Sequence, residues 1–160
     1  MKILESDGVK ITYLTVEEYI KILDHTRQKV DFSKFRFMES VNWLEKTIEI
    51  YKILTLNDYI NAERSNKYKA AKLKKEYTDF FAREFIGEKI TKPVDIHFIW
   101  HLKNKRRDID NIAFMQKFIL DGMVKAGTLK DDNMQWVQGL KHDLIINRKL
   151  KLEKVTVKTI

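Results

Sequence analysis

Five aspartates lie within residues 108 to 132, directly after a run of basic side chains. The acids are Asp108, Asp110, Asp121, Asp131 and Asp132, and Arg106 and Arg107 come immediately before the first of them. Carboxylates bind hard divalent cations and guanidinium groups bind phosphate, so the combination is typical of a metal site beside a phosphate group. An isolated Asp-x-Asp is a weak signal, because acids are common in loops and at helix starts.

Residues 111 to 126 have the spacing of one amphipathic helix that Gly127 ends. Apolar residues recur every three or four positions at Ile112, Met115, Ile119, Met123 and Ala126. Asp110, Lys117 and Asp121 fall on the opposite side, where Lys117 and Asp121 each lie within roughly 20° of Asp110 at about 100° per residue. We therefore expect a buried apolar face and a polar stripe.

Asp110 would lie near the N-terminus of this helix, where unpaired N–H groups and the helix dipole favour an ionised carboxylate. A divalent cation could use such a group. The alternative is that Asp110 is only an N-cap and that Lys117 forms an ordinary i,i+4 salt bridge with Asp121.

The segment resembles the signature of RusA-type Holliday-junction resolvases, which are small Mg²⁺-dependent endonucleases of phage and prophage origin. The similar features are a basic run, Asp-x-Asp-Asn at residues 108 to 111, Lys117 four residues before Asp121, the turn at 126 to 127 and the acid pair at 131 to 132. Residues 57 to 59 and the basic segment from Arg64 are similar to the family's opening segment. The resemblance covers residues 46 to 160.

The resemblance implies that Asp108, Asp110 and Asp132 bind Mg²⁺, with Mn²⁺ as a substitute, and that Lys117 is a catalytic lysine. It also implies a homodimer acting on branched double-stranded DNA. The interval from Asp110 to Lys117 is longer by about one turn than in shorter members of the family, so an insertion lies near residues 113 to 115.

Phosphodiester hydrolysis explains why such groups belong together. Bound Mg²⁺ acidifies water and neutralises phosphate oxygens, and it prefers a few carboxylates in an octahedral shell of oxygens. A lysine beside it could stabilise transition-state charge or orient the attacking water.

Basic charge is concentrated in the same part of the chain. The net charge is +8, and residues 1 to 50 hold 8 basic and 9 acidic side chains, which leaves 23 and 14 for residues 51 to 160. Two clusters are the expected DNA contacts: Lys67, Lys69, Lys72, Lys74 and Lys75, and then Lys103, Lys105, Arg106 and Arg107. The alternative for any single lysine is a solvated helix face.

The first cluster begins a helix predicted over residues 66 to 85. Its candidate buried or half-buried positions are Tyr68, Ala71, Leu73, Tyr77, Phe80, Phe81 and Phe85. Strands are expected over 9 to 14, 46 to 54, 94 to 102, 134 to 140 and 150 to 157, with a short helix over 15 to 24 and a turn near Asn57. Residues 32 to 42 are ambiguous.

These elements predict an α/β or α+β fold, a mixed sheet flanked by helices in a single compact RusA-like domain. That domain would span residues 46 to 160, and residues 1 to 45 would be an extension or small subdomain of unknown role.

Other features exclude whole classes. Cysteine is absent, which rules out disulfides and thiolate zinc sites. There is no apolar run of about 18 residues and no signal-peptide pattern, so we expect no membrane insertion and a cytoplasmic location. His97 and His101 lie about 13 Å apart on a strand, too far for one metal ion, and are expected to be packing residues.

The leading hypothesis is a metal-dependent endodeoxyribonuclease that resolves four-way junctions. The alternatives are a nuclease acting on other branched DNA and a non-catalytic branched-DNA-binding protein. A sugar-nucleotide transferase using Asp-x-Asp would need a larger domain than this chain offers.

Overall fold

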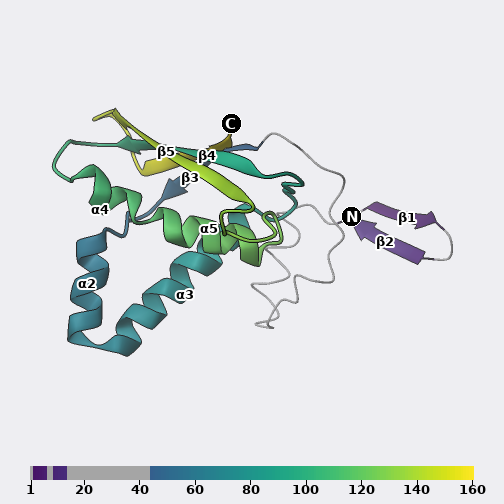
Figure 1. Ribbon diagram of the computed structural model, residues 1–160, viewed down its shortest axis with the longest axis horizontal. Coiled ribbons are helices and arrows are strands. Elements are labelled where there is room, and N and C mark those ends of the chain that lie inside the picture. The colour runs from purple at the N-terminus through teal and green to yellow at the C-terminus, as the bar shows by residue number, and fades with distance from the viewer. Residues whose placement is uncertain (1, 7–8, 14–43) are drawn as a thin grey trace. The chain divides into compact units, whose positions relative to one another are not determined.

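The computed structural model describes residues 2–6, 9–13 and 44–160. The chain divides into two compact units, Met1–Arg36 and Phe37–Ile160. In the first unit, β1 (Lys2–Ser6) and β2 (Val9–Tyr13) form an antiparallel hairpin with Ser6 opposite Val9 (Figure 1). The strand predicted over residues 9 to 14 is confirmed. The predicted helix at 15 to 24 and the ambiguous segment at 32 to 42 lie outside the described residues.

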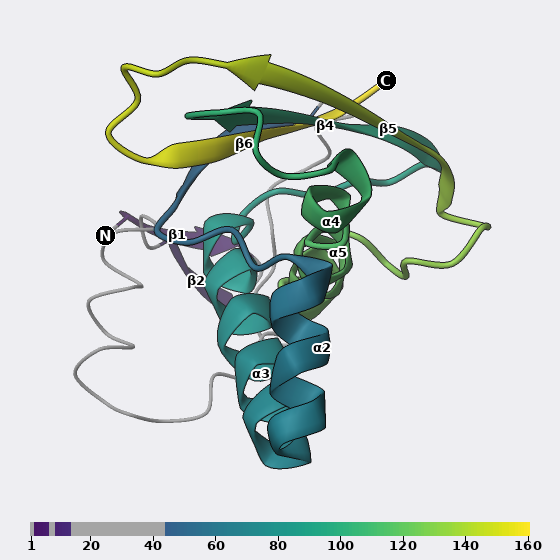
Figure 2. The same cartoon turned by 90° about the vertical axis from the view of Figure 1, so that its left-hand side faces the viewer.

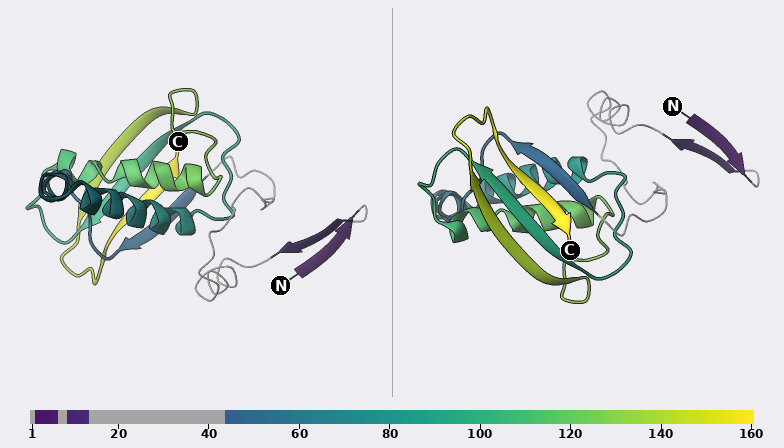
Figure 3. Two further views of the ribbon diagram at one scale, coloured as in Figure 1. Left: turned by 90° about the horizontal axis from the view of Figure 1, so that it is seen from below. Right: turned by 90° about the horizontal axis from the view of Figure 1, so that it is seen from above.

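The second unit contains a mixed four-stranded sheet, as predicted. Its strands are β3 (Glu45–Ile50), β4 (Val94–Leu102), β5 (Val137–Ile146) and β6 (Glu153–Thr159), in the order β3-β6-β4-β5. Strands β4 and β5 are parallel and the other pairs are antiparallel (Figure 3). The connection between the parallel strands carries the aspartates of the motif.

Four helices of residues 44–160 lie on one face of this sheet (Figures 2 and 3). They are α2 (Leu56–Ser65), α3 (Lys67–Glu84), α4 (Ile109–Ala113) and α5 (Gln116–Lys125). The core between the two layers includes Phe81, Phe85, Phe98, Trp100 and Phe118, each at most 1% exposed. The fold is therefore α+β. Every helix within residues 44–160 is too short or too polar to span a lipid bilayer.

Helix α2 replaces the turn predicted near Asn57. Thr55 is its N-cap: the Asp58 N–H donates to Thr55 Oγ1 at 3.2 Å, and the Thr55 N–H donates to Asp58 Oδ2 at 3.1 Å. This reciprocal capping box gives partners to N–H groups that otherwise lack them, so a helix begins where a turn was expected.

Helix α3 confirms the prediction for residues 66 to 85. Asn66 caps it, with Oδ1 accepting from the Tyr68 N–H at 2.8 Å. The burial expected at Tyr68 and Ala71 was wrong: Tyr68 is 73% exposed, and Ala70 rather than Ala71 is buried. The first half of α3 lies beside α2, and the two helices extend together away from the sheet (Figure 2). The fully buried Phe81 therefore lies in the second half of α3.

The single helix predicted over residues 111 to 126 is wrong, because two helices occupy it. At the junction the Met115 N–H donates to Ile112 O and the Lys117 N–H to Phe114 O, both at 3.1 Å, which are the tighter i,i+3 bonds. The Phe114 ring packs against Tyr59 of α2 and Phe118, with centroids 5.4 and 5.5 Å away. The break lies where the sequence predicted an inserted turn.

The predicted apolar face survives this break. Ile112, Met115, Ile119, Met123 and Ala126 are all fully buried. Gly127 ends α5 as expected, with φ +75°, a value that favours glycine. The Thr128 N–H donates to Met123 O at 2.9 Å and the Gly127 N–H to Val124 O at 3.0 Å, so the last turn is closed by backbone bonds.

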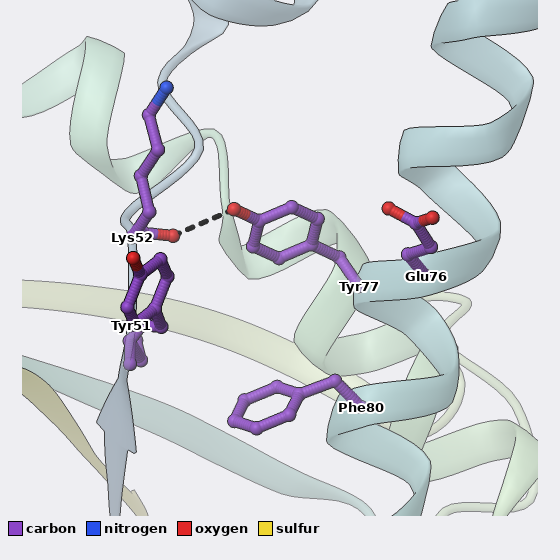
Figure 4. A pocket seen from close by; sticks show the side chains of 6 residues that line it. Tyr51, Lys52, Glu76, Tyr77 and Phe80 are labelled. Atoms are coloured by element: carbon purple, nitrogen blue, oxygen red, sulfur yellow. Dashed lines mark hydrogen bonds between the residues drawn. The ribbon is translucent and has the colours of Figure 1, made fainter.

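A shallow pocket lies between the end of β3 and α3 (Figure 4). Tyr77 donates its hydroxyl proton to Lys52 O at 2.8 Å across it, and Tyr51 beside it is 92% exposed. The pocket encloses about 250 Å³, less than the roughly 300 Å³ at which ligand sites usually begin. The pocket is therefore too small for a typical ligand site.

Candidate functional site

Lys117 is the centre of a charged group on the exposed side of α5. Its Nζ donates to Asp121 Oδ1 at 2.7 Å and lies 3.5 Å from Asp132 Oδ2. The hydrogen bond to Asp121 raises the pKa of Lys117 most, and Asp132 raises it further, against a smaller lowering by burial. Lys117 is therefore an ammonium ion at neutral pH. The predicted ion pair with Asp121 is present, and Asp132 joins it from a distant loop.

The loop that carries Asp132 uses its neighbouring acid differently. Asp131 Oδ1 accepts from the Asp132 N–H at 2.8 Å, and its Oδ2 accepts from Asn133 Nδ2 at 2.7 Å. Asn133 Oδ1 in turn accepts from the Gln135 N–H at 3.0 Å. Asp131 thus stabilises the loop, whereas the half-buried Asp132 faces Lys117.

Asp108 and Asp110 lie at the N-terminus of α4. Asp108, and not Asp110, takes the N-cap position, with φ −72° and ψ 149°, yet its side chain makes no capping hydrogen bond. Both side chains are exposed, and neither has a hydrogen-bond or ion-pair partner among residues 44–160.

The predicted metal ligands are not gathered into one group. Among the described residues, no three His, Cys, Asp or Glu side chains are placed to hold a metal ion. The structure brings Lys117, Asp121 and Asp132 together, and it leaves Asp108 and Asp110 as a separate exposed pair. Their hard oxygen donors suit Mg²⁺ chemically, so metal binding stays a prediction.

Glu153, at the start of β6, anchors the basic loop that precedes Asp108. Its Oε1 pairs with the Arg107 guanidinium and accepts from the Lys103 N–H at 3.0 Å. Lys103, Lys105 and Arg106 keep exposed side chains. Within this predicted DNA-contact cluster, Arg107 therefore already forms a structural ion pair with Glu153. Sequence reasoning missed Glu153, because no local pattern relates residues so far apart.

The lysines predicted on α3 are all exposed. Lys72 lies 3.8 Å from Glu76 in an i,i+4 pair whose side chains are 77% and 56% exposed, a geometry of little energetic consequence. Exposure is expected both for DNA contacts and for a solvated helix face, so it does not distinguish them.

A half-buried histidine, His142, links β5 to the start of α5. Trp100 Nε1 donates to His142 Nδ1 at 3.0 Å, so Nε2 carries the proton and donates to Gln116 Oε1 at 2.7 Å. Burial lowers the pKa of His142, and the nearby His97 lowers it further, which favours this neutral form. Gln116 directly precedes Lys117. The predicted strand ended at residue 140, so this chain of bonds was missed.

His97 and His101 contact different partners. His97 Nε2 lies 2.7 Å from Asp143 Oδ2, and His101 Nε2 lies 3.0 Å from Thr156 Oγ1. The bond with His97 lowers the pKa of Asp143, and so does the bond with Lys141. Burial lowers the pKa of His101, with a further contribution from Lys154. These contacts fit packing residues.

The β4–β5 connection thus carries one ammonium held between two carboxylates, two free carboxylates and an anchored basic loop. A cation such as Lys117 can neutralise charge on a bound anion, and free carboxylates can bind a cation. No protein-family model and no curated protein matches this chain. A proposal about its function therefore rests on these residues and their motif.

Proposed function

We propose that the protein is a Mg²⁺-dependent, structure-selective endodeoxyribonuclease that resolves four-way DNA junctions by paired symmetric cleavage, in recombination and repair. The observation that carries the proposal is the contact of Lys117 with both Asp121 and Asp132. The contact with Asp132 joins α5 to the loop that follows it, two parts of the motif that helix spacing alone does not bring together. The resemblance to RusA-type resolvases supplies the substrate class.

Each side chain has a role in this proposal. Asp108, Asp110 and Asp132 hold the Mg²⁺, which when bound supplies an activated water and neutralises phosphate oxygens. Three ligands on one ion require the loop of Asp132 and the N-terminus of α4 to approach each other, since no such group exists in the described residues. Metal binding should therefore bring these two segments together.

Lys117 acts as a fixed positive charge. Its raised pKa makes it a poor base at neutral pH and a good electrostatic partner for a phosphate oxygen. Asp121 is a positioning residue, because its hydrogen bond directs the ammonium.

Two surfaces would contact the DNA backbone. Lys103, Lys105 and Arg106 are exposed beside Asp108, and the lysines of α3 form a second exposed set. The excess of basic over acidic residues after residue 50 favours a polyanion through counterion release. A two-fold junction would be matched by a homodimer with two active sites.

The test uses Asp108→Asn and Asp132→Asn on labelled synthetic junctions. With Mg²⁺ we expect cleavage to fall by at least about 100-fold, while junction binding in metal-free buffer stays within about twofold. Glu63→Gln is the control, since it removes the same charge from an exposed position on α2. Full cleavage by both aspartate variants would contradict the proposal.

One observation favours a non-catalytic branched-DNA-binding protein instead. No three metal donors converge in the described residues, and Lys117 with Asp121 also forms an ordinary i,i+4 pair. On that view the wild-type chain binds junctions and cuts none of them with either Mg²⁺ or Mn²⁺. Cleavage measured on a panel of junctions, flaps and forks would also distinguish a junction resolvase from a nuclease that acts on other branched DNA.

A further inference from the structure

Strand β5 forms one edge of the sheet over its whole length. It pairs with β4 on one side, and no described strand pairs with its other side. It exposes apolar side chains as well: Leu140 is 46% exposed, Leu144 37% and Ile145 46%. A long edge with unpaired N–H and C=O groups and exposed apolar side chains is a template for another strand unless something covers it.

The backbone groups that face this free edge can be identified. The Asn147 N–H donates to Leu102 O of β4 at 2.8 Å. Successive residues of a strand direct their N–H and C=O groups to opposite sides, so the odd-numbered residues of β5 from 139 onward face β4. The even-numbered residues, among them Leu140, His142 and Leu144, direct theirs to the free edge.

The sequence of β5 is complementary to itself around His142. Residues 140 to 144 read Leu-Lys-His-Asp-Leu. In an antiparallel pair with a two-fold axis at His142, Lys141 lies opposite the partner's Asp143, and Leu140 lies opposite the partner's Leu144. His142 packs on Phe98, so Leu140 and Leu144 share the helix-covered face, while Lys141 and Asp143 share the other face.

Other registers lack this match. An axis at Lys141 or at Asp143 would place two like charges directly opposite each other, which is unfavourable. Lys141 and Asp143 are 59% and 49% exposed, so both can reach a neighbouring strand.

We propose that two copies of this chain associate edge to edge through β5, in antiparallel orientation about an axis at His142. The two four-stranded sheets then form one continuous sheet. The partner is a second copy because the complementarity is two-fold: each Lys141 meets an Asp143 and each Leu140 meets a Leu144. This interface does not depend on nuclease activity, and its test does not measure activity.

The first test inverts the charges in the full-length chain. Sedimentation should show a wild-type dimer at micromolar concentration. Lys141→Asp places two acids opposite each other at two symmetry-related positions and should weaken the dimer at least about tenfold, and Asp143→Lys should do the same with two bases. The double variant exchanges the charges and should recover the dimer to within about threefold. Lys151→Asp, an exposed change outside β5, should leave the dimer unchanged.

The second test fixes the register by cross-linking, because the chain contains no cysteine. Residues of a hydrogen-bonded antiparallel pair have Cα atoms about 5.5 Å apart, within disulfide reach. Leu140→Cys combined with Leu144→Cys should give a covalent dimer on oxidation, and either substitution alone should not. A monomeric wild type, or a dimer insensitive to both charge variants, would overturn the proposal. Either result would mean that the edge is free, or that another part of the chain or a different partner covers it.

Discussion

The two halves of the β4–β5 connection differ in what stabilises them. Helix α5 buries Phe118, Ile119 and Met123 against the sheet and α3, and a glycine turn closes its end. Residues 103–108 are mostly exposed, and Glu153 holds them through Arg107 and the Lys103 N–H. Apolar packing therefore holds α5 in place independently of its polar side chains. Lys117, and Asp108 and Asp110 before it, are not needed for that packing and can be selected for a function.

Asp108 shows how weakly the exposed half is stabilised. An N-cap carboxylate that accepts a backbone hydrogen bond usually stabilises a helix by about 1 kcal/mol. Asp108 holds that position without the bond, so α4 forgoes this stabilisation. Positions where a local rule is broken without a structural gain are the ones at which function is expected.

The largest expected effect concerns the packed half. Gly122 of α5 lies so close to α3 that an added Cβ would sit 2.7 Å from Phe81 Cβ and 2.8 Å from Ala82 N. Because these atoms are near the backbone of another helix, Gly122→Ala should destabilise the fold by about 2 to 3 kcal/mol. Urea denaturation followed by circular dichroism measures this. A loss below about 0.5 kcal/mol would mean that α3 and α5 can separate easily.

The next effect concerns the hydrogen bonds that join α5 to the sheet. His142→Leu removes the partner of Nε1 of the fully buried Trp100 and of Gln116 Oε1, so we expect a loss of about 2 kcal/mol by the same measurement. His142→Asn is the matched control, because Asn can still accept from Trp100. It should recover part of the loss, and equal losses for the two variants would show that the hydrogen bond contributes nothing.

These variants also carry a pH prediction. The pKa of His142 in the folded chain is below its ordinary value of about 6.5, so unfolding takes up a proton. The stabilisation is complete above about pH 6.5 and is lost as the pH falls through the folded pKa. His101, whose pKa is also lowered, acts in the same direction. Urea titrations at about pH 7.5 and 5.5 should give a smaller stability difference for His142→Asn than for the wild type.

A smaller effect is expected in the exposed half. Glu153→Gln weakens the pairing with Arg107 and leaves the Lys103 N–H with a neutral acceptor, so we expect a loss of about 1 kcal/mol. Hydrogen exchange should rise in residues 103–108 and stay unchanged in α5. Faster exchange in both segments would show that the halves are not independent.

The elements predicted best from the sequence are those whose position depends on local spacing. Strand β4 was predicted with its observed ends, because an apolar run lies between Pro93 and the basic cluster. The break before α5 was missed because Phe114 packs on Tyr59, a contact between segments that sequence spacing does not reveal. The end of β5 was misplaced because an edge strand mixes polar and apolar residues on both faces.

The candidate site divides in the same way. The bond between Lys117 and Asp121 follows from i,i+4 spacing and was predicted. The approach of Asp132 depends on how the loop after α5 returns along the helix, so only the family resemblance pointed to it. Glu153 and His142 act across strands, and neither left a pattern in the sequence.

The smallest stability effect should accompany the largest functional one. Lys117→Met keeps the aliphatic stem and removes the charge. The side chain is 51% exposed, so solvent screening reduces its ion pairs to about 0.5 kcal/mol of stability at neutral pH. Because the pKa of Lys117 is raised, the wild-type contribution should persist to above about pH 10.5 and be lost as the pH rises further.

Junction cleavage by Lys117→Met should nevertheless fall by at least about 100-fold, since a fixed charge at a reacting phosphate contributes on that scale. Lys125→Met is the matched control, because Lys125 lies on the same helix and pairs with Asp79 of α3. It should lose a similar amount of stability with unchanged cleavage. If both variants lose cleavage in proportion to stability, Lys117 acts only as a surface ion pair, and the polar side of α5 then serves stability alone.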